Sequence, residues 1–199
     1  MTKLKTDYFQ SEDVVGLAKD LIGKKLYSLI DDGLTSGIIV ETEAYSGKND
    51  KACHAHLGRF TKRTATMYKK GGTAYVYLCY GIHHLLNIVT NGEGHADAVL
   101  IRALMPIDGF EIMQRRFDND QNKVKICSGP GKLTKALGID KNFNDVDITC
   151  SEQLWIADSG FELTADIVET TRIGIDYAEE DAFLPWRFYL KGNKCVSKY

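Results

Sequence analysis

The chain has 199 residues, of which 44% are hydrophobic, and its formal net charge at pH 7 is −2. This length and apolar content suit one globular domain over residues 1–199. The sequence has no apolar run near the ~20 residues that cross a bilayer, no apolar leader after Met1, and no CxxC pair among its five cysteines. We therefore expect a cytoplasmic protein, nucleoid-associated if bacterial, with no membrane partner and no disulfide framework.

The first part of the chain predicts a helix followed by a hairpin. Residues 11–22 carry apolar side chains at helical spacing, with Ser11 in the N-cap position and Gly23 at the C-terminal stop. Two strands are predicted next, over residues 25–30 and 36–45, on either side of the turn sequence Asp31-Asp32-Gly33. Residues 46–72 are polar, basic and rich in Gly and Thr, which predicts a long ordered loop of the kind that often carries function.

The remaining chain predicts strands with two more helices. One helix is expected to begin at Asp108, and another begins near Pro130 and ends at Gly138. The predicted strands cover residues 73–80, 84–90, 98–105, 153–157 and 186–191. Helices packed against a largely antiparallel, curved sheet make the expected fold class α+β.

The strand at residues 36–45 pairs a carboxylate with an aromatic ring. Glu43 and Tyr45 are two residues apart and therefore share a strand face. Glu41 has the same parity, so spacing alone does not choose between the two glutamates. A carboxylate beside a flat ring is suited to holding a planar molecule and performing acid or base chemistry at its edge.

The strand at residues 73–80 carries further aromatic side chains. Tyr75 and Tyr77 share a face, and Tyr80 precedes Gly81, where a hairpin would turn. Aromatic residues at alternate strand positions are also common in cores and in cross-strand pairs, so a purely structural interpretation is the alternative.

Positive charge is concentrated in two segments. Residues 48–70 contain seven Lys or Arg residues and a single acidic residue, Asp50. A second basic stretch covers residues 115–135. The second stretch surrounds Ser128-Gly129-Pro130-Gly131, a turn that leads into a helix whose free backbone N–H groups could meet a phosphate. Basic clusters are also often only solvated surface.

Motifs for metals and nucleotide cofactors are missing from the sequence. The histidines and cysteines near residues 53–56 and 79–84 lack the paired spacings of zinc sites. No phosphate-loop or dinucleotide fingerprint occurs in a strand-to-helix context. We therefore predict neither a metal nor a cofactor.

Several blocks, taken in order, resemble a known family. They are Glu41-Thr-Glu-Ala-Tyr45, His54, Tyr75-Val-Tyr77, Tyr80-Gly81, Asn87-Ile88, Leu100-Ile-Arg102-Ala-Leu104, Cys127-Ser-Gly-Pro130-Gly-Lys132-Leu133, Arg172-Ile-Gly-Ile175 and Arg187-Phe-Tyr189. This order resembles the alkyladenine DNA glycosylases, also called 3-methyladenine DNA glycosylases of the mammalian type. The resemblance covers nearly the whole chain.

The resemblance implies a monofunctional DNA glycosylase of base excision repair. Such an enzyme rotates a damaged purine out of double-stranded DNA, hydrolyses its bond to deoxyribose and leaves an abasic site. The implied substrates are 3-methyladenine, 7-methylguanine, hypoxanthine and ethenoadenine. No lysine matches a Schiff-base nucleophile, and the acid that would protonate a neutral base is not identified. We expect a monomer with a protruding hairpin that inserts into DNA.

The resemblance also assigns roles to individual residues. Glu43 is the implied general base, acting on a water that Arg102 and the backbone carbonyl of Ile173 also hold. Tyr45, His54 and Tyr77 sandwich the extruded base, and Tyr80 is the wedge that fills the vacated space in the duplex. The backbone near Ala52 and His54 reads the purine 6-position, Asn87 excludes normal guanine by crowding its 2-amino group, and Arg59, Arg63 and Lys132 contact the DNA backbone.

Two other classes of protein remain open at this point. A non-catalytic protein that binds DNA lesions would keep the aromatic residues and the wedge but would not need Glu43 together with Arg102. A hydrolase of free nucleosides would keep the pocket but would not need Tyr80 or the basic loop. The sequence also departs from the family pattern at Ile82, which replaces a methionine common beside the wedge.

Overall fold

The longest strand, β3 (Gly33–Tyr45), organises the fold described by the computed structural model, which covers residues 2–30, 32–118 and 120–198. β3 pairs with β2 (Lys25–Ile30) along its first half, with β6 (Asp97–Asp108) along most of its length, and with β9 (Arg187–Leu190) near its end. Nearly every side chain of β3 is buried, because other elements cover both faces of this part of the sheet.

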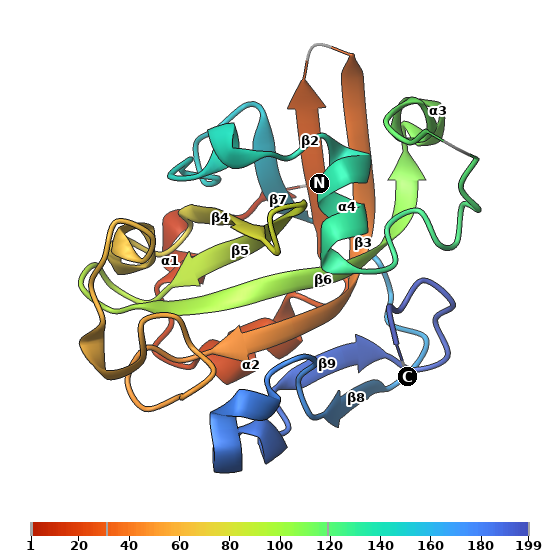
Figure 1. Cartoon of the computed structure of the whole chain (residues 1–199). Coiled ribbons are helices and arrows are strands. Elements are labelled where there is room, and N and C mark those ends of the chain that lie inside the picture. The colour runs from red at the N-terminus through yellow and green to blue at the C-terminus, as the bar shows by residue number, and fades with distance from the viewer. Residues whose placement is uncertain (1, 31, 119, 199) are drawn as a thin grey trace.

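The other strands extend the sheet from both sides of β3 (Figure 1). Their order is β1-β7-β2-β3-β6-β5-β4, and β8 joins through β9; every strand pair in the described residues is antiparallel. The bounds are β1 (Thr2–Lys3), β4 (Ala74–Cys79), β5 (His83–Thr90), β7 (Leu154–Asp158) and β8 (Ile167–Thr170). This open antiparallel sheet with helices confirms the α+β class.

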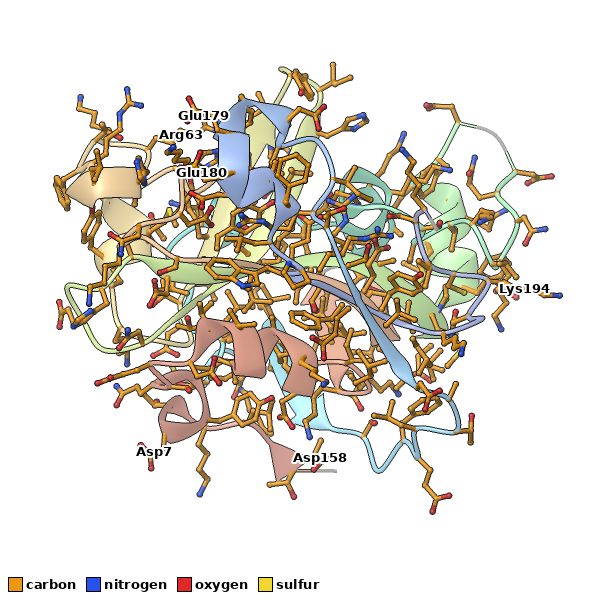
Figure 2. The ribbon with its side chains drawn as sticks, turned by 90° about the horizontal axis from the view of Figure 1, so that it is seen from below. Asp7, Arg63, Asp158, Glu179, Glu180 and Lys194 are labelled. Atoms are coloured by element: carbon orange, nitrogen blue, oxygen red, sulfur yellow. The ribbon has the colours of Figure 1, made fainter. Side chains whose placement is uncertain are left out.

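Helices lie on both sides of the central strands. Figure 2 shows α2 on one side of β6, and α4, the β4–β5 hairpin and the helical turn η4 on the other side. The helices are α1 (Thr6–Phe9), α2 (Val14–Asp20), α3 (Phe110–Arg115) and α4 (Pro130–Leu137), and the short 3₁₀ segments are η1 (His56–Gly58), η2 (Ala65–Tyr68), η3 (Lys141–Phe143) and η4 (Asp176–Phe183).

The core has one large cluster and two smaller ones. The large cluster joins α2 and α4 to the sheet through residues such as Leu21, Ile101 and Leu133, all fully buried. A smaller cluster contains Cys53, Ala55, Met67, Tyr75, Val89, Ala96 and Ala98, and a third joins Ala52 to Ile175 and Ala178. The loop at residues 46–72 is thus fixed by its own small core, as expected for an ordered loop.

Several element bounds differ from the sequence-based prediction for local reasons. The helix predicted over residues 11–22 begins only at Val14, because the cap is Asp13, whose Oδ1 accepts the N–H of Gly16 at 2.8 Å. The helix expected from Asp108 begins at Phe110, since Asp108 still belongs to β6. Strands β1 and β8 and helix α1 were not predicted. Asp31 of the predicted turn lies outside the described residues, but Ile30 faces Gly33 as a hairpin requires.

An irregularity in the pairing of β3 with β6 determines where three charged side chains meet. Glu41 faces Ala103 and Thr42 faces Ile101, so Arg102 on β6 has no direct partner across the strands. Such irregularities redirect side chains and increase the local twist. Here the irregularity brings the guanidinium of Arg102 to both Glu41 and Glu43.

Candidate active site

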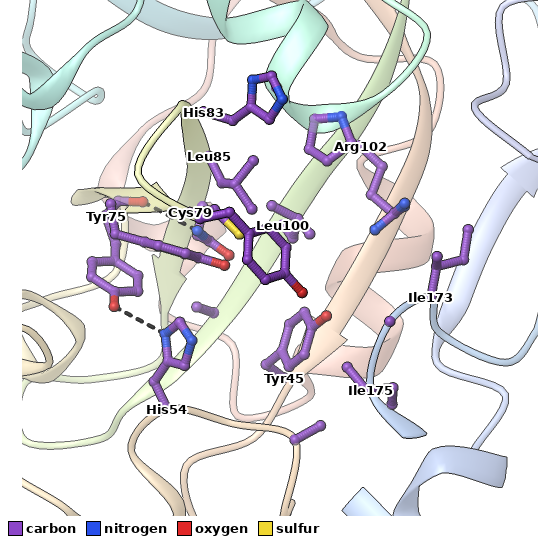
Figure 3. A pocket seen from close by; sticks show the side chains of 18 of the residues that line it. Tyr45, His54, Tyr75, Cys79, His83, Leu85, Leu100, Arg102, Ile173 and Ile175 are labelled. Carbon is purple, nitrogen blue, oxygen red and sulfur yellow. Dashed lines mark hydrogen bonds between the residues drawn. The ribbon is translucent and has the colours of Figure 1, made fainter. Parts of the chain in front are cut away.

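A cavity of about 760 Å³ lies between β3, the β4–β5 hairpin, the start of α4 and residues 173–177 (Figure 3). Most of the predicted site residues line this one cavity: Tyr45, Ala52, His54, Arg63, Tyr77, Tyr80, Asn87, Arg102, Lys132 and Ile173. Glu43 and Arg59 are not among the lining residues. Arg59 instead lines a neighbouring cavity of about 370 Å³, which shares His54 and Arg63 with the first.

Glu43 lies directly behind the cavity wall and is fully buried. Its Oε2 accepts the hydroxyl of Tyr45 at 2.6 Å and lies 3.2 Å from Nη1 of Arg102. Its Oε1 accepts the backbone N–H of Ile173 at 2.8 Å. In Figure 3 the polar ends of Tyr45 and Arg102 point toward each other, with Ile173 beside them. All three partners line the cavity, so only one layer of residues separates the carboxylate from it.

Ile173 makes a contact with Glu43 that the resemblance did not imply. Its backbone N–H donates to Glu43, while the role of its backbone carbonyl in holding the attacking water stays a prediction. An ionised carboxylate has about four acceptor positions on its two oxygens. The hydrogen bonds from Tyr45 and Ile173 engage one position on each oxygen, Arg102 adds an ion pair at Oε2, and one position on Oε1 is left.

Glu41 has a different environment from Glu43, although both are completely buried. Its carboxylate accepts from Nε of Arg187 at 2.8 Å, from Nε of Arg102 at 3.2 Å, and from the backbone N–H and hydroxyl of Ser197 at 2.7 and 2.9 Å. Glu41 therefore accepts from four protein donors, three on Oε1 and one on Oε2, against two hydrogen bonds to Glu43. The structural ion pair that the sequence left open for Glu41 is therefore present.

Two side chains beside Glu43 are held in their donating forms. Burial alone lowers the pKa of Arg102, but the charges of Glu43 and Glu41 outweigh it and hold that pKa above its ordinary value. Burial raises the pKa of Tyr45 well above its usual range, and the charge of Glu43 raises it further. Both groups therefore keep their protons and direct them at the carboxylate.

Further aromatic side chains at the cavity come from β4 and the loop before it. The ring centroids of Tyr75 and Tyr77 are 5.3 Å apart, and the imidazole of His54 meets Tyr77 edge-on at 4.8 Å. The guanidinium carbon of Arg63 lies 4.8 Å from the centroid of the Tyr77 ring. Flat faces and a cation of this kind suit a planar ligand.

Hydrogen bonds fix the tautomer of His54. Nη2 of Arg63 lies 3.2 Å from Nε2, and the hydroxyl of Tyr75 lies 3.0 Å from Nδ1. Arginine only donates, so Nε2 is the acceptor and the neutral ring carries its proton on Nδ1. Burial, followed by the charge of Arg63, lowers the pKa of His54 to about 4, so the ring is neutral at physiological pH.

The polar backbone and amide groups of the cavity are also oriented. The N–H of Ala52 donates to Oδ1 of Asp50 at 3.0 Å, and the carbonyl of Ala52 accepts the hydroxyl of Tyr177 at 3.3 Å. Of these two Ala52 groups, the carbonyl keeps a lone pair for a ligand. The Nδ2 group of Asn87 donates to the carbonyl of Tyr75 at 3.2 Å. This bond fixes the orientation of the side-chain amide, whose other end is Oδ1.

Tyr80 stands at the tip of the β4–β5 hairpin, as predicted. Cys79 faces His83, and the chain turns through Tyr80 and Gly81 with positive φ values of 50° and 72°. The side chain of Tyr80 is 91% exposed, and Leu78 and Ile82 beside it are also exposed. An apolar tip therefore projects from the cavity edge.

The basic loop is less positive than its composition indicates. Lys51 lies 2.6 and 2.7 Å from carboxylates of Glu179 and Glu180, and Lys69 and Lys70 pair with acids at residues 145 and 147. These partners lie far along the chain, so no local signal could have revealed them.

The first turn of α4 packs closely against the hairpin. A Cβ added to Gly131 would lie 2.8 Å from the ring of His83, so glycine is required for this approach. Lys132 follows it, exposed and at the cavity. A buried ion pair between Asp50 and Arg172 was not predicted, although Arg172 begins one of the sequence blocks.

Two other kinds of site are absent from the part of the chain that the structure describes. Over residues 2–30, 32–118 and 120–198, no group of three or more His, Cys, Asp or Glu side chains is arranged to hold a metal ion. In the same ranges no helix has the length and apolar character needed to cross a membrane.

Comparison with known proteins places the chain in a family. The family model described as Methylpurine-DNA glycosylase matches residues 8–194. A Chlamydia pneumoniae protein named "Putative 3-methyladenine DNA glycosylase" is 48% identical over 188 residues, which cover 94% of each chain. A protein of the same name from Clostridium acetobutylicum is 46% identical, and the match covers 95% of each chain. Another from Methanocella arvoryzae is also 46% identical, and the match covers 96% of this chain and 94% of the relative. The chain therefore belongs to the methylpurine-DNA glycosylase family and is a DNA repair enzyme that hydrolyses N-glycosyl bonds.

Proposed function

We propose that this glycosylase flips 3-methyladenine, 7-methylguanine, hypoxanthine and ethenoadenine out of double-stranded DNA and excises them with Glu43 as the general base. The observation that carries the proposal is the position of Glu43, one residue layer behind an aromatic cavity, with two hydrogen bonds and the ion pair of Arg102 on its carboxylate and an acceptor position left on Oε1. A water bound there is directed at the sugar carbon of a base held in the cavity.

The chemistry follows from the charge that develops on the sugar. As the base departs, the sugar carbon gains oxocarbenium-like positive charge, which a nearby carboxylate stabilises while it removes a proton from the attacking water. Arg102 and the N–H of Ile173 orient the carboxylate. Water is the nucleophile, so the product is an abasic site and the DNA strand stays intact.

Recognition of the base rests on stacking between Tyr45 on one side and Tyr77 with His54 on the other. Stacking of a base on an aromatic ring contributes about 1 to 3 kcal/mol and tolerates different bases, which accounts for a broad range of purines. The carbonyl of Ala52 provides an acceptor at the base edge. The fixed amide of Asn87 crowds the 2-amino group of guanine and so excludes it.

Access to the base requires the duplex to be opened, and we assign this step to Tyr80. Its exposed ring at the hairpin tip enters the minor groove and fills the space that the flipped nucleotide leaves. Unstacking one step costs a few kcal/mol, which the new contacts offset. Arg59, Arg63 and Lys132 then meet the phosphates around the flipped nucleotide, and the enzyme acts as a monomer.

The test uses duplex oligonucleotides that carry one hypoxanthine, ethenoadenine or 7-methylguanine. We expect the protein to release the base, so that alkali cleaves the strand at that position, and we expect no trapped covalent complex with borohydride because no Schiff base forms. Glu43→Gln should still bind the lesion duplex but release the base several orders of magnitude more slowly.

Three outcomes would count against the proposal. Lesion binding without any base release would indicate a non-catalytic protein, and release from free nucleosides but not from DNA would indicate a nucleosidase. Excision by Glu43→Gln at nearly the normal single-turnover rate would remove Glu43 from the mechanism.

A further inference from the structure

Arg172 and Asp50 form a buried ion pair behind the wall of the cavity. Both terminal nitrogens of Arg172 donate to Asp50, at 2.5 Å to Oδ2 and 2.8 Å to Oδ1, and neither side chain is exposed. Neither residue lines the cavity. A bidentate pair of this kind fixes orientation as well as distance.

The guanidinium of Arg172 supports the stacking wall. It lies between two aromatic rings, with its central carbon 4.9 Å from the centroid of Tyr45 and 5.1 Å from that of Trp186. Arg172 does not line the cavity and Tyr45 does, so Arg172 covers the face of Tyr45 that is turned away from the cavity. Nη1 also donates to the carbonyl of Ala44 at 2.9 Å, which fixes the backbone next to Tyr45.

The same residue anchors the segment that contacts Glu43. Ile173 follows Arg172 directly, and its N–H reaches Oε1 of Glu43 at 2.8 Å. Nη2 of Arg172 donates to the carbonyl of Asp181 at 3.1 Å, which ties the far side of this segment to η4. The two groups that donate hydrogen bonds to Glu43, the hydroxyl of Tyr45 and the N–H of Ile173, therefore depend on Arg172 for their placement.

Asp50 links this arrangement to the turn at the base edge. Its Oδ1 accepts the N–H of Ala52 at 3.0 Å, and its Oδ2 accepts the N–H of Ser46 at 3.3 Å. The backbone on both sides of Asp50 thus takes its position from a carboxylate that Arg172 holds. One ion pair connects the stacking ring, the base edge and the segment at Glu43.

We propose that Arg172, held by Asp50, is a positioning residue for base excision, which fixes Tyr45 and the N–H of Ile173 relative to Glu43. This inference rests on the proposed role of Glu43. A displacement of about 1 Å in a positioned group can lower a rate roughly 10²-fold. Lysine keeps the charge but cannot hold Asp50 and the carbonyl of Ala44 in one planar fork, so Arg172→Lys should loosen the arrangement without leaving a buried anion unpaired.

The test compares Arg172→Lys with Arg116→Lys. Arg116 also forms a bidentate pair, with Asp32 through Nε at 3.0 Å and Nη2 at 2.5 Å, and donates to the carbonyl of Ala136, but it lies away from the cavity. For both variants the midpoint of thermal unfolding, the affinity for an ethenoadenine duplex and the single-turnover excision rate are measured. The fluorescence of ethenoadenine, which changes with stacking, is recorded in each complex.

We expect Arg172→Lys to fold, to bind the duplex almost as well as wild type, to alter the ethenoadenine fluorescence and to slow excision by about 10- to 100-fold. Arg116→Lys should keep the wild-type rate and fluorescence, whatever its loss in unfolding midpoint. Asp50→Glu keeps the charge but lengthens the side chain, so it should give the same changes as Arg172→Lys. If Arg172→Lys does not fold, Asp50→Glu is used in its place.

Wild-type excision and fluorescence in a folded Arg172→Lys protein would overturn the inference. An equal rate loss in Arg116→Lys would also overturn it, because the loss would then reflect stability alone. If the wild-type protein releases no base, the proposed role of Glu43 fails instead, and the fluorescence comparison still decides whether Arg172 positions Tyr45.

Discussion

The hydroxyl of Tyr45 donates a 2.6 Å hydrogen bond to Glu43, two residues earlier on the same strand. One residue thus provides a stacking face to the cavity and a donor to the carboxylate behind it. The two functions are separable, because the ring and the hydroxyl can be changed independently.

Tyr45→Phe should slow base excision while leaving lesion binding nearly intact. The ring remains, but Glu43 loses a hydrogen bond, and bonds to charged groups contribute about 1.5 to 3 kcal/mol, which corresponds to roughly 10- to 100-fold in rate. The single-turnover excision rate measures the first effect, and the affinity for a lesion duplex measures the second. Tyr68→Phe is the control, since the buried hydroxyl of Tyr68 has no hydrogen-bond partner among the described residues. Weaker binding with an unchanged rate would contradict the expectation.

Substitution of Glu41 and of Glu43 should lower the folding stability by different amounts. Glu41→Gln leaves Arg187 without its carboxylate in a buried site, and breaking a buried pair costs about 3 to 5 kcal/mol of folding free energy. Glu43→Gln should cost less, because Arg102 keeps Glu41 as a partner. Denaturant unfolding of both variants measures the difference. A larger loss of stability in Glu43→Gln would reverse the assignment of structural and catalytic roles.

Local sequence signals predicted the elements that depend on local chemistry. The strand at residues 25–30 and the helix from Pro130 to the Gly138 cap have the predicted bounds, because a turn composition, an N-terminal proline and a C-terminal glycine act within a few residues. The alternation of Tyr75 and Tyr77 likewise follows from the period of a strand, and both line the cavity as one wall.

Features that depend on distant partners could not be predicted. Parity alone left Glu41 and Glu43 equivalent, and what separates them is Arg187 and Ser197, which lie more than 140 residues away along the chain. The sequence does not show that Lys51 is paired, because its partners Glu179 and Glu180 are distant along the chain and come close only in the folded protein. β8 was missed because its four residues are mostly half-buried and lack the alternation of a strand with one buried face.

Tyr80→Ala should affect duplex substrates more than single strands. The wedge is needed only where a base pair and its stack must be opened, so we expect weaker binding and slower excision on a lesion duplex and nearly normal excision from a single strand. Leu163→Ala, which removes an exposed apolar side chain outside the main cavity, is the control. Equal losses on duplex and single strand would remove Tyr80 from the role of wedge.

The pKa of His54 should make the protein less stable in acid. This pKa is about 4 in the folded protein, because burial and then the charge of Arg63 lower it from 6.5. Between these values the unfolded chain binds more protons than the folded one, so stability rises with pH in this window. The contribution of neutral His54 is complete above about pH 6.5 and is lost as the pH falls toward about 4.

Denaturant unfolding near pH 7 and near pH 4.5 measures this effect, at most on the order of 3 kcal/mol between the two conditions. In His54→Gln the difference between the two pH values should shrink, because glutamine does not titrate. The variant His95→Gln, which removes an exposed imidazole, should retain the wild-type difference. An equally steep loss of stability in acid for His54→Gln would contradict the expectation. The acid sensitivity would then come from other groups, and the fold would tolerate a charged imidazole at His54 beside Arg63 and Tyr77.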